Sequence, residues 1–268
     1  MLIGVSQLIV VPTSRGKTSL FYGPLLVVQH LLKNPRPGIG PLPQYPVIME
    51  ITPLNALGDS QASEMDELGI HAISVNAEAL QSTAHEGRNL VTEIRHCEWS
   101  ASPWSPERLI DHAVDGLLRD PVFRENILLL AIDETHIIDH WGKAFRKAYQ
   151  QIGLLRKQLP AHVPLVAVTD TLVPGAEQAN ICKSLGLHDN FYFMCQSCER
   201  PNVHVVIREL THSLTGMLFP DVDWVLENGE KVVIYSKTLD LCFRVALYHF
   251  RTPSEGPYKA LLIMVSLL

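Results

Sequence analysis

Two acids and a histidine, Asp133, Glu134 and His136, follow directly after the apolar run from Ile127 to Ile132. The run is too short for a free-standing helix and too apolar for a half-exposed strand, so it predicts a strand buried on both faces of a parallel sheet. Acids at the end of such a strand are costly unless a cation binds there, and open α/β sheets bind ligands at this edge. Nucleotide hydrolysis would use one acid to hold Mg²⁺, the other to accept a proton from water, and the histidine to sense the γ-phosphate.

A phosphate-binding loop elsewhere in the chain would test this interpretation, and the sequence VPTSRGKT from Val11 to Thr18 provides one. A strand, a Gly-Lys-Thr loop and a helix hold phosphates through backbone N–H groups and the helix N-terminus. Lys17 is expected to pair with the β- and γ-phosphates, and the Thr18 hydroxyl to ligate Mg²⁺ together with Asp133. The predicted ATP and Mg²⁺ contacts are Thr13, Ser14, Arg15, Gly16, Lys17, Thr18 and Asp133, and the predicted catalytic residues are Lys17, Asp133, Glu134 and His136.

Simpler interpretations exist for both motifs. Lys17 and Thr18 could be an ordinary start of a helix, and Asp133 and Glu134 could be a charge pair at a helix N-terminus. The presence of a phosphate loop and an acidic pair in one chain favours the nucleotide site.

Apolar strands alternate with amphipathic helices along the chain. The expected strands are 8–11, 47–51, 71–75, 127–132, 165–169, 191–194, 203–207 and 231–236. The expected helices are 17–33, 55–68, 77–87, 107–118, 149–158, 175–185 and 238–249. Ser105 is expected to cap the helix that starts at 107, after an irregular segment at 93–106. The alternation predicts an α/β fold with a mainly parallel sheet and helices on both faces.

The composition is that of a folded intracellular protein. The 268 residues are 47% hydrophobic and 19% charged, which is enough to bury a core in one or two domains. The net charge of -6 argues mildly against non-specific nucleic-acid binding, although a local basic surface can still exist. Five cysteines predict free thiols. No secretory signal or bilayer-spanning segment is visible, so we expect a soluble chain without a membrane partner.

The aromatic segment after the acidic motif has two interpretations. Trp141, Phe145 and Tyr149 have the i, i+4, i+8 spacing of a core helix face. The interleaved cations suit a single-stranded nucleic acid, with rings stacking on bases and cations on phosphates. These cations are Lys143, Arg146 and Lys147.

Metal chemistry other than Mg²⁺ has weaker support. His136 and His140 are four residues apart and could share a metal on one helix face, but no third ligand is evident. Cys195 and Cys198 have the spacing of a zinc knuckle without a second ligand pair, so we interpret them as structural and expect no structural zinc. A metal-dependent phosphodiesterase that uses Asp133 and His136 would need more clustered ligands.

The ordered motifs resemble those of the first motor domain of RecQ-like superfamily 2 (DExH) DNA helicases, in a form common in fungi. The matching segments are PTSRGKT at 12–18, ITPLNALGDSQ at 51–61, SPERL at 105–109, DETH at 133–136, AVTDT at 167–171 and ERPN at 199–202. Trp141, Gly142, Phe145, Arg146 and Tyr149 resemble the aromatic-rich loop that is most specific to this family.

This resemblance implies a RecA-like P-loop NTPase domain over residues 1–210, a linker over 211–230 and the partial start of a second RecA-like domain over 231–268. It implies ATP-dependent 3′-to-5′ unwinding of DNA, with ATP hydrolysis, in the nucleus and in DNA repair and recombination. The partner would be single-stranded or partly duplex DNA. The residues expected to contact it are Trp141, Lys143, Phe145, Arg146, Thr52, Pro53 and Ser105.

The chain also departs from the family pattern. The glutamine motif upstream of the phosphate loop is missing, Ser14 and Arg15 replace glycines, and Asp170 replaces the alanine of motif III. One β-α unit resembles the start of the second domain, and the tail 251–268 matches nothing. The chain is therefore expected to lack the arginine finger, the zinc-binding part and the winged-helix part. We therefore expect a truncated chain that binds ATP weakly, hydrolyses it poorly and does not unwind DNA. The alternative is a catalytically inactive helicase-like remnant that binds ATP or nucleic acid.

Overall fold

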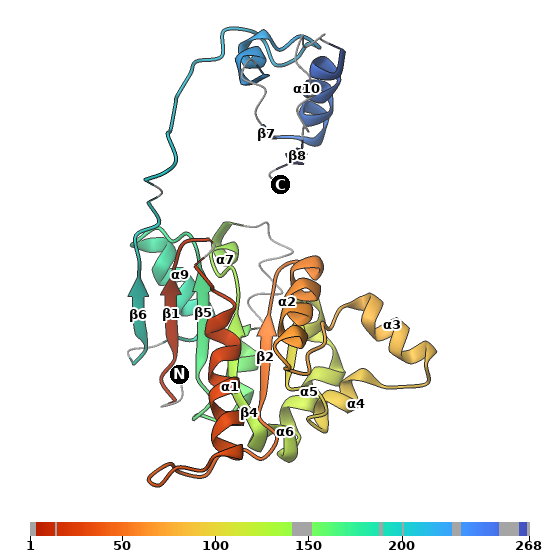
Figure 1. Cartoon of the computed structure of the whole chain (residues 1–268), viewed down its shortest axis with the longest axis vertical. Helices are drawn as coiled ribbons and strands as arrows, with labels where there is room; N and C mark the ends of the chain where they lie inside the picture. Colours follow the sequence, from red (N-terminus) through yellow and green to blue (C-terminus); the bar gives the residue numbers. More distant parts are fainter. Residues whose placement is uncertain are drawn as a thin grey trace. The chain divides into compact units, whose positions relative to one another are not determined.

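The computed structural model describes residues 4–13, 15–140, 152–187, 190–199, 201–226, 232–251 and 263–266. The chain divides into two compact units, Met1–Arg200 and Pro201–Leu268. The first unit contains a sheet covered by helices, and the second is a small helix-and-strand unit (Figure 1). This division lies before the boundary at residue 210 that the sequence suggested.

Six parallel strands form the sheet of the first unit. They are β1 Gln7–Val10, β2 Val47–Ile51, β3 Ala101–Trp104, β4 Ile127–Ile132, β5 Leu165–Thr169 and β6 Tyr192–Cys195. The order across the sheet is β3-β2-β4-β5-β1-β6, and every pairing is parallel. The expected α/β architecture is therefore confirmed. Because parallel strands end at the same edge, the segments that follow β1, β2, β4 and β5 meet there.

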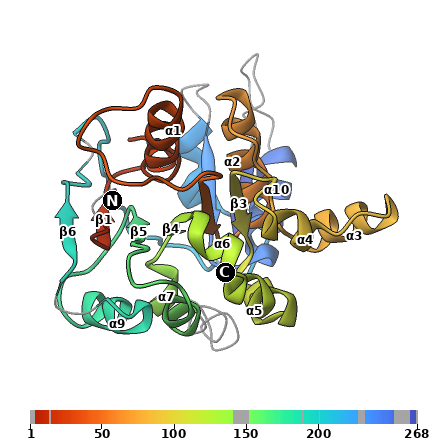
Figure 2. The same cartoon turned by 90° about the horizontal axis from the view of Figure 1, so that it is seen from below.

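Helices cover both faces of this sheet. They are α1 Ser19–Lys33, α2 Asn55–Glu67, α3 Ala77–His85, α4 Leu90–Arg95, α5 His112–Arg119, α6 Pro121–Asn126, α7 Ile137–His140 and α9 Ala176–Leu185, and residues 152–158 are also helical. The helices α1 and α2 lie on one side of the sheet, and α5, α7 and α9 lie on the other (Figure 2).

The central strand shows why two helix layers are needed. Leu130 and Ile132 belong to one buried cluster, and Leu129 and Ala131 belong to the other. Successive side chains of a strand point to opposite faces, so a strand that is apolar at every position buries both of its faces. The prediction of a doubly buried strand after residue 126 is confirmed.

One edge of the sheet differs from the prediction. Residues 71–75 were expected to form a strand, but they make only isolated bridges at Ala72 and Val75. The strand lies instead at β3, inside the segment expected to be irregular. Pro103 has no N–H to donate, which an edge position tolerates, and Trp104 is 1% exposed.

The helix expected at 107–118 was also wrong in detail. Pro106–Ile110 forms a 3₁₀ helix, and α5 starts only at His112. Ser105 makes no side-chain capping bond, which corrects its expected role. The short α6, which was not expected, is capped by the Asp120 carboxylate and leads directly into β4.

The second unit contains a 3₁₀ helix at Pro220–Leu226, the parallel pair β7 Val233–Ser236 and β8 Ile263–Ser266, and α10 Leu239–Arg251. Both β7 and α10 agree with the predicted β-α unit. The strand expected at 203–207 is wrong, because these residues have no regular structure. Among the described residues, no helix has the length and apolar character needed to cross a membrane.

Candidate functional site

The predicted site lies where three strands of the sheet end. The backbone N–H of Val11, which begins the phosphate loop, donates to the carbonyl of Thr169 at the end of β5. The N–H of Asp133 donates to the carbonyl of Ile51 at the end of β2, and the N–H of Thr135 donates to Val168. Main-chain bonds between neighbouring segments therefore hold the phosphate loop, the acidic motif and the segment after β5 at one edge.

The phosphate-loop lysine contacts the acidic motif directly. Lys17 Nζ lies 2.7 Å from Glu134 Oε1, and the two side chains are only 12% and 22% exposed. The residue before the lysine, Gly16, has φ +74°, a left-handed conformation that glycine adopts without strain. The predicted meeting of the loop with the acidic motif is present in the fold.

The two acids of the motif point to different partners. Glu134 has φ +50°, which is uncommon for a residue other than glycine. This turn directs Glu134 to Lys17, whereas Asp133 accepts a hydrogen bond from Gln61 Nε2 at 3.0 Å. Asp133 also accepts from the backbone N–H of Glu134 at 2.9 Å. A strained conformation at the motif is consistent with a functional site.

The environment of the two acids separates their pKa values. Burial and the neighbouring charge of Glu134 raise the pKa of Asp133 to about 6, although Lys17 and Gln61 oppose this rise. Burial would also raise the pKa of Glu134, but nearby His136 and Lys17 outweigh it and lower that pKa below its ordinary value. Glu134 is therefore ionised at neutral pH. A cation beside Asp133 would favour the ionised form of Asp133.

His136 links the acidic motif to the end of β5. Its Nδ1 lies 2.8 Å from Thr169 Oγ1, and the hydroxyl of Thr169 donates to the carbonyl of Thr171 at 3.0 Å. The hydroxyl proton is therefore committed, so the imidazole is expected to carry a proton on Nδ1 and to donate it to Thr169. The chain of contacts from Lys17 through Glu134 and His136 reaches the segment after β5.

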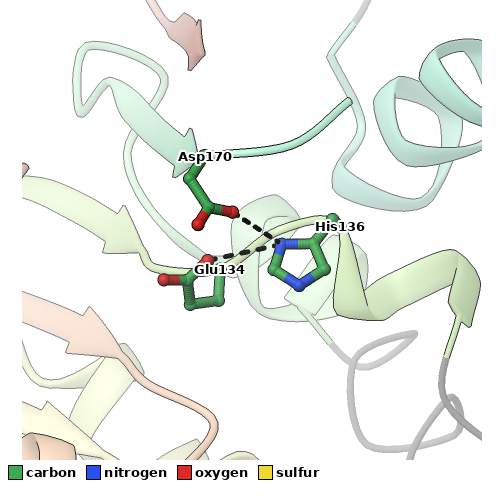
Figure 3. A group of neighbouring side chains, drawn as sticks. All are labelled: Glu134, His136 and Asp170. Carbon is green, nitrogen blue, oxygen red and sulfur yellow. Dashed lines mark ion pairs between the residues drawn. The ribbon is translucent and has the colours of Figure 1, made fainter. Parts of the chain in front are cut away.

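Asp170 completes the site from β5. His136 Nδ1 lies 3.3 Å from Glu134 Oε2 and 3.8 Å from Asp170 Oδ1 (Figure 3). Thr13 Oγ1 of the phosphate loop donates to Asp170 Oδ2 at 2.8 Å. Burial would raise the pKa of Asp170, but the hydroxyl of Thr13 and the nearby charges of Lys17 and His136 lower it.

The ligand atoms of Glu134, His136 and Asp170 lie within 4.8 Å of one another. From the sequence we considered Thr18 with Asp133 for Mg²⁺, and His136 with Asp133 or His140 for another metal. The pairing of β4 with β5 adds Asp170 to this region. The ammonium of Lys17 already lies against this group through Glu134, so a cation is present without a metal.

The loop residues fit a nucleotide and Mg²⁺. Thr13 and Arg15 are exposed, and Thr18 adopts a helical conformation at the N-terminus of α1. The backbone N–H of Arg15 bonds to the carbonyl of Pro12, and its exposed side chain is compatible with the predicted direction away from the phosphates. Ser14 lies outside the described residues. Lys17, the Thr18 hydroxyl and the Asp133 carboxylate are the donor set that a triphosphate with Mg²⁺ requires.

The predicted nucleic-acid contacts divide into two sets. Trp141, Lys143, Phe145 and Arg146 lie outside the described residues. The other three residues are buried, which disfavours contact with nucleic acid through their side chains in this arrangement. They are Thr52, Pro53 and Ser105.

Cys195 and Cys198 are both free and exposed. The thiol of Cys198 donates to the carbonyl of Asp170 at 2.8 Å, so it fixes the backbone at the end of the site. The side chain of His140 lies outside the described part, so its predicted pairing with His136 stays a prediction.

Two buried polar residues near Asp133, Gln61 and Glu50, have no role that the sequence alone indicated. Gln61 is 3% exposed, and Glu50 on β2 is completely buried. Neither carboxyl oxygen of Glu50 has a hydrogen bond of normal geometry among the described residues, although Gln61 lies close enough to oppose the rise of its pKa. Burial and the charge of Asp133 raise the pKa of Glu50 well above its ordinary value. The acid inside the apolar run VIMEI was the sequence feature that could have indicated a buried carboxyl at residue 50.

A cavity of about 850 Å³ lies away from this site. Its lining includes Pro24, Leu31, Pro41, Asn126 and Pro164. None of the predicted site residues lines it, so the site is identified by the meeting of its side chains and not by a cavity.

Comparisons with known proteins agree with this arrangement. The chain is 27% identical over 204 residues to the ATP-dependent DNA helicase RecQ of Synechocystis, a match that covers 75% of this chain and 38% of that relative. It is 29% identical over 188 residues to a protein of Acanthamoeba polyphaga mimivirus described as an ATP-dependent RNA helicase, covering 70% of this chain and 32% of that relative. The chain thus spans about a third of the length of each of these relatives.

The fold also resembles a solved structure. The DUF1998 helicase MrfA bound to DNA and AMPPNP is 16% identical with a TM-score of 0.61, over 92% of this chain and 33% of that chain. This similarity supports the RecA-like fold alone. The fungal form of the RecQ resemblance stays a prediction. A family model described as DEAD/DEAH box helicase matches residues 1–178, which is well over half of the sequence, and the chain therefore belongs to the DEAD/DEAH box helicase family.

Proposed function

We propose that this chain is the ATP-binding motor part of a RecQ-type DNA helicase, which binds Mg-ATP at the phosphate loop and hydrolyses it. The contact between Lys17 and Glu134 carries the proposal, because it brings the phosphate-binding lysine and the catalytic acid together at the ligand edge of the sheet. The RecQ relatives support the substrate assignment.

Each side chain has a distinct role in the proposed reaction. Lys17 would leave Glu134 to pair with the β- and γ-phosphates, and the hydroxyl of Thr18 would ligate Mg²⁺ with Asp133. Mg²⁺ supplies charge neutralisation on the phosphates when it is bound. Glu134 would then orient the attacking water and accept its proton, because its lowered pKa keeps it ionised at neutral pH.

His136 is proposed to connect hydrolysis to the nucleic-acid surface. It contacts Glu134 on one side and Thr169 on the other. A change in the position of Glu134 on nucleotide binding would therefore reach the segment after β5. This connection is the proposed route by which ATP state controls contact with single-stranded or partly duplex DNA and drives 3′-to-5′ movement.

The wider assignments follow from the same family. We propose a motor domain over residues 1–210, a linker over 211–230 and a partial second RecA-like domain over 231–268. We propose a role in DNA repair and recombination in the nucleus. The helicase would be both a hydrolase, because it hydrolyses ATP, and an isomerase, because it separates DNA strands. No structural zinc is part of this proposal.

A second candidate is a nucleotide-binding chain that does not turn over ATP. The carboxylate of Asp170 favours it, because Asp170 contacts the phosphate loop through Thr13 and lies close to His136. An acid beside the γ-phosphate opposes the charge that phosphoryl transfer must accommodate.

Steady-state ATP hydrolysis with and without single-stranded DNA separates the two candidates. The motor proposal expects hydrolysis that DNA stimulates and that Lys17→Ala abolishes. RNA of the same sequence serves as the comparison, since one relative is described as an RNA helicase. ATP binding without hydrolysis above that of Lys17→Ala would support the second candidate. Strand separation by the pure chain would refute the expectation that it does not unwind DNA alone.

A further inference from the structure

The carboxylate of Asp170 takes contacts that a γ-phosphate would need. Thr13, at the mouth of the phosphate loop, donates its hydroxyl to Asp170 Oδ2 at 2.8 Å. The imidazole of His136 lies 3.8 Å from Asp170 Oδ1. Lys17, which would bind the phosphates, lies close enough for its charge to favour the ionised form of Asp170. One carboxylate therefore accepts a hydrogen bond from Thr13 and lies close to His136, and the charge of Lys17 is near enough to act on it.

The segment around Asp170 holds this carboxylate in place. The hydroxyl of Thr171 donates to Asp170 Oδ1 at 3.3 Å, and the thiol of Cys198 donates to the Asp170 carbonyl at 2.8 Å. The preceding residue, Thr169, is completely buried at the end of β5. Asp170 is thus held at the edge of the site, while its own side chain remains 28% exposed.

The charges at this edge determine which nucleotide the proposed site would prefer. Asp170 and Glu134 place two carboxylates around Lys17 and His136, so a further anion beside Asp170 meets a like charge. In the proposed site, ATP would bring its γ-phosphate to this position, whereas ADP would end before it. The diphosphate can therefore use the loop and the helix N-terminus while the contacts of Asp170 stay intact.

We propose that Asp170 is a specificity-determining residue that occupies the γ-phosphate position, so that the free chain binds ADP more tightly than ATP. This inference rests on the proposed nucleotide site and adds a preference to it. For ATP to bind, the Asp170 carboxylate would have to give up its hydrogen bond from Thr13 and shift away from the γ-phosphate. Binding of the diphosphate requires neither change.

Equilibrium binding of Mg-ADP and Mg-ATP to the full chain, at one pH and salt concentration, tests the preference. Asp170→Asn keeps the side-chain shape and removes the charge, and Asp170→Ala removes both charge and hydrogen bonds. Asp111→Asn removes a surface carboxylate outside the site and is the control. We expect Asp170→Asn and Asp170→Ala to tighten ATP binding about tenfold relative to ADP, and the control to leave the ratio unchanged.

The same titrations distinguish two kinds of failure. If Lys17→Ala loses binding but the ATP-to-ADP affinity ratio is the same in the wild type and both Asp170 variants, the proposed site stands and the role of Asp170 is refuted. If neither nucleotide binds to any variant, or Lys17→Ala binds like the wild type, the nucleotide site itself is refuted, and the preference with it. Thermal unfolding of each variant confirms that the comparison is between folded proteins.

Discussion

The ammonium of Lys17 lies 2.7 Å from the carboxylate of Glu134, although 117 residues separate them in the sequence. The contact joins the loop after β1 to the turn after β4, two strands that are separated in the sheet by β5. Each group neutralises the other while no phosphate is bound. A phosphate that takes Lys17 therefore also releases Glu134 toward water, which couples substrate binding to activation of the proposed base.

Glu134→Gln separates binding from hydrolysis. The amide keeps the shape of the side chain but cannot accept the proton from water, so turnover should fall by about 10²–10⁴-fold. Mg-ATP binding should be retained, because Lys17 no longer has an anionic competitor. Single-turnover hydrolysis and equilibrium binding measure the two effects, with the surface variant Glu107→Gln as the control. Undiminished turnover in Glu134→Gln would remove this residue from the mechanism.

Gln61 lowers the pH at which the Asp133 carboxylate becomes available to a cation. The pKa of Asp133 is raised to about 6, so its charged form is present above that pH and is lost below it. Mg-ATP binding should therefore weaken between pH 7.5 and 5.5. Gln61→Met removes the 3.0 Å hydrogen bond to the carboxylate, disfavours its charged form and should move this loss to higher pH. Identical binding profiles for wild type and Gln61→Met would contradict this role.

Glu50 should make the fold less stable as pH rises. Its folded-state pKa is raised well above the ordinary value of 4.5. As pH rises, the carboxyl therefore ionises in the unfolded chain before it does in the folded chain, and this ionisation stabilises the unfolded chain. The stabilising contribution of its protonated form is present below about pH 4.5 and is lost as pH increases toward the raised folded pKa. Glu50→Leu should therefore increase the free energy of unfolding by about 1–3 kcal/mol at pH 8 and by less at pH 4.

Glu50→Gln is the matched control for this stability prediction. It removes the titration but leaves a buried amide without an assigned partner, so it should flatten the pH dependence without the full gain of Glu50→Leu. Urea unfolding across pH 4–8 measures both variants. A loss of stability in Glu50→Leu at pH 8 would show that the carboxyl has a stabilising partner.

Two glycine-to-alanine changes test how closely the helices of the first unit pack. A Cβ at Gly153, in the helical segment 152–158, would lie 2.6 Å from the carbonyl oxygen of Ser184 in α9. Gly153→Ala should therefore destabilise the protein by about 1–3 kcal/mol. A Cβ at Gly23 in α1 meets no atom within 4 Å, so Gly23→Ala should stabilise it by about 0.5–1 kcal/mol. Thermal unfolding that ranks the two variants in the opposite order would contradict the packing of 152–158 against α9.

The sequence predicted the structure best where a local pattern is compatible with few structures. The apolar run before Asp133 predicts β4 because burial on both faces leaves no polar alternation, and Gly-Lys-Thr predicts a phosphate loop because few other roles need those residues together. The edge strand β3 was missed because Pro103 argues against a strand, and an edge position makes this proline acceptable.

Contacts between distant residues were the part that sequence could not supply. Asp170 was visible as a departure from a family motif, but its bond to Thr13 and its closeness to His136 depend on the pairing of β5 with both β1 and β4. The burial of Gln61 against Asp133 likewise depends on how α2 packs. Those relationships follow from strand order, which a local pattern does not encode.

Equilibrium binding of Mg-ATP to the wild-type chain beside Lys17→Ala tests the central claim most directly. The account predicts saturable binding by the wild type and a loss of that binding in Lys17→Ala, because the lysine is the only cation of the phosphate loop that contacts the acidic motif among the described residues. Equal binding by the two proteins, or no binding by the wild type, would contradict a nucleotide site at this loop.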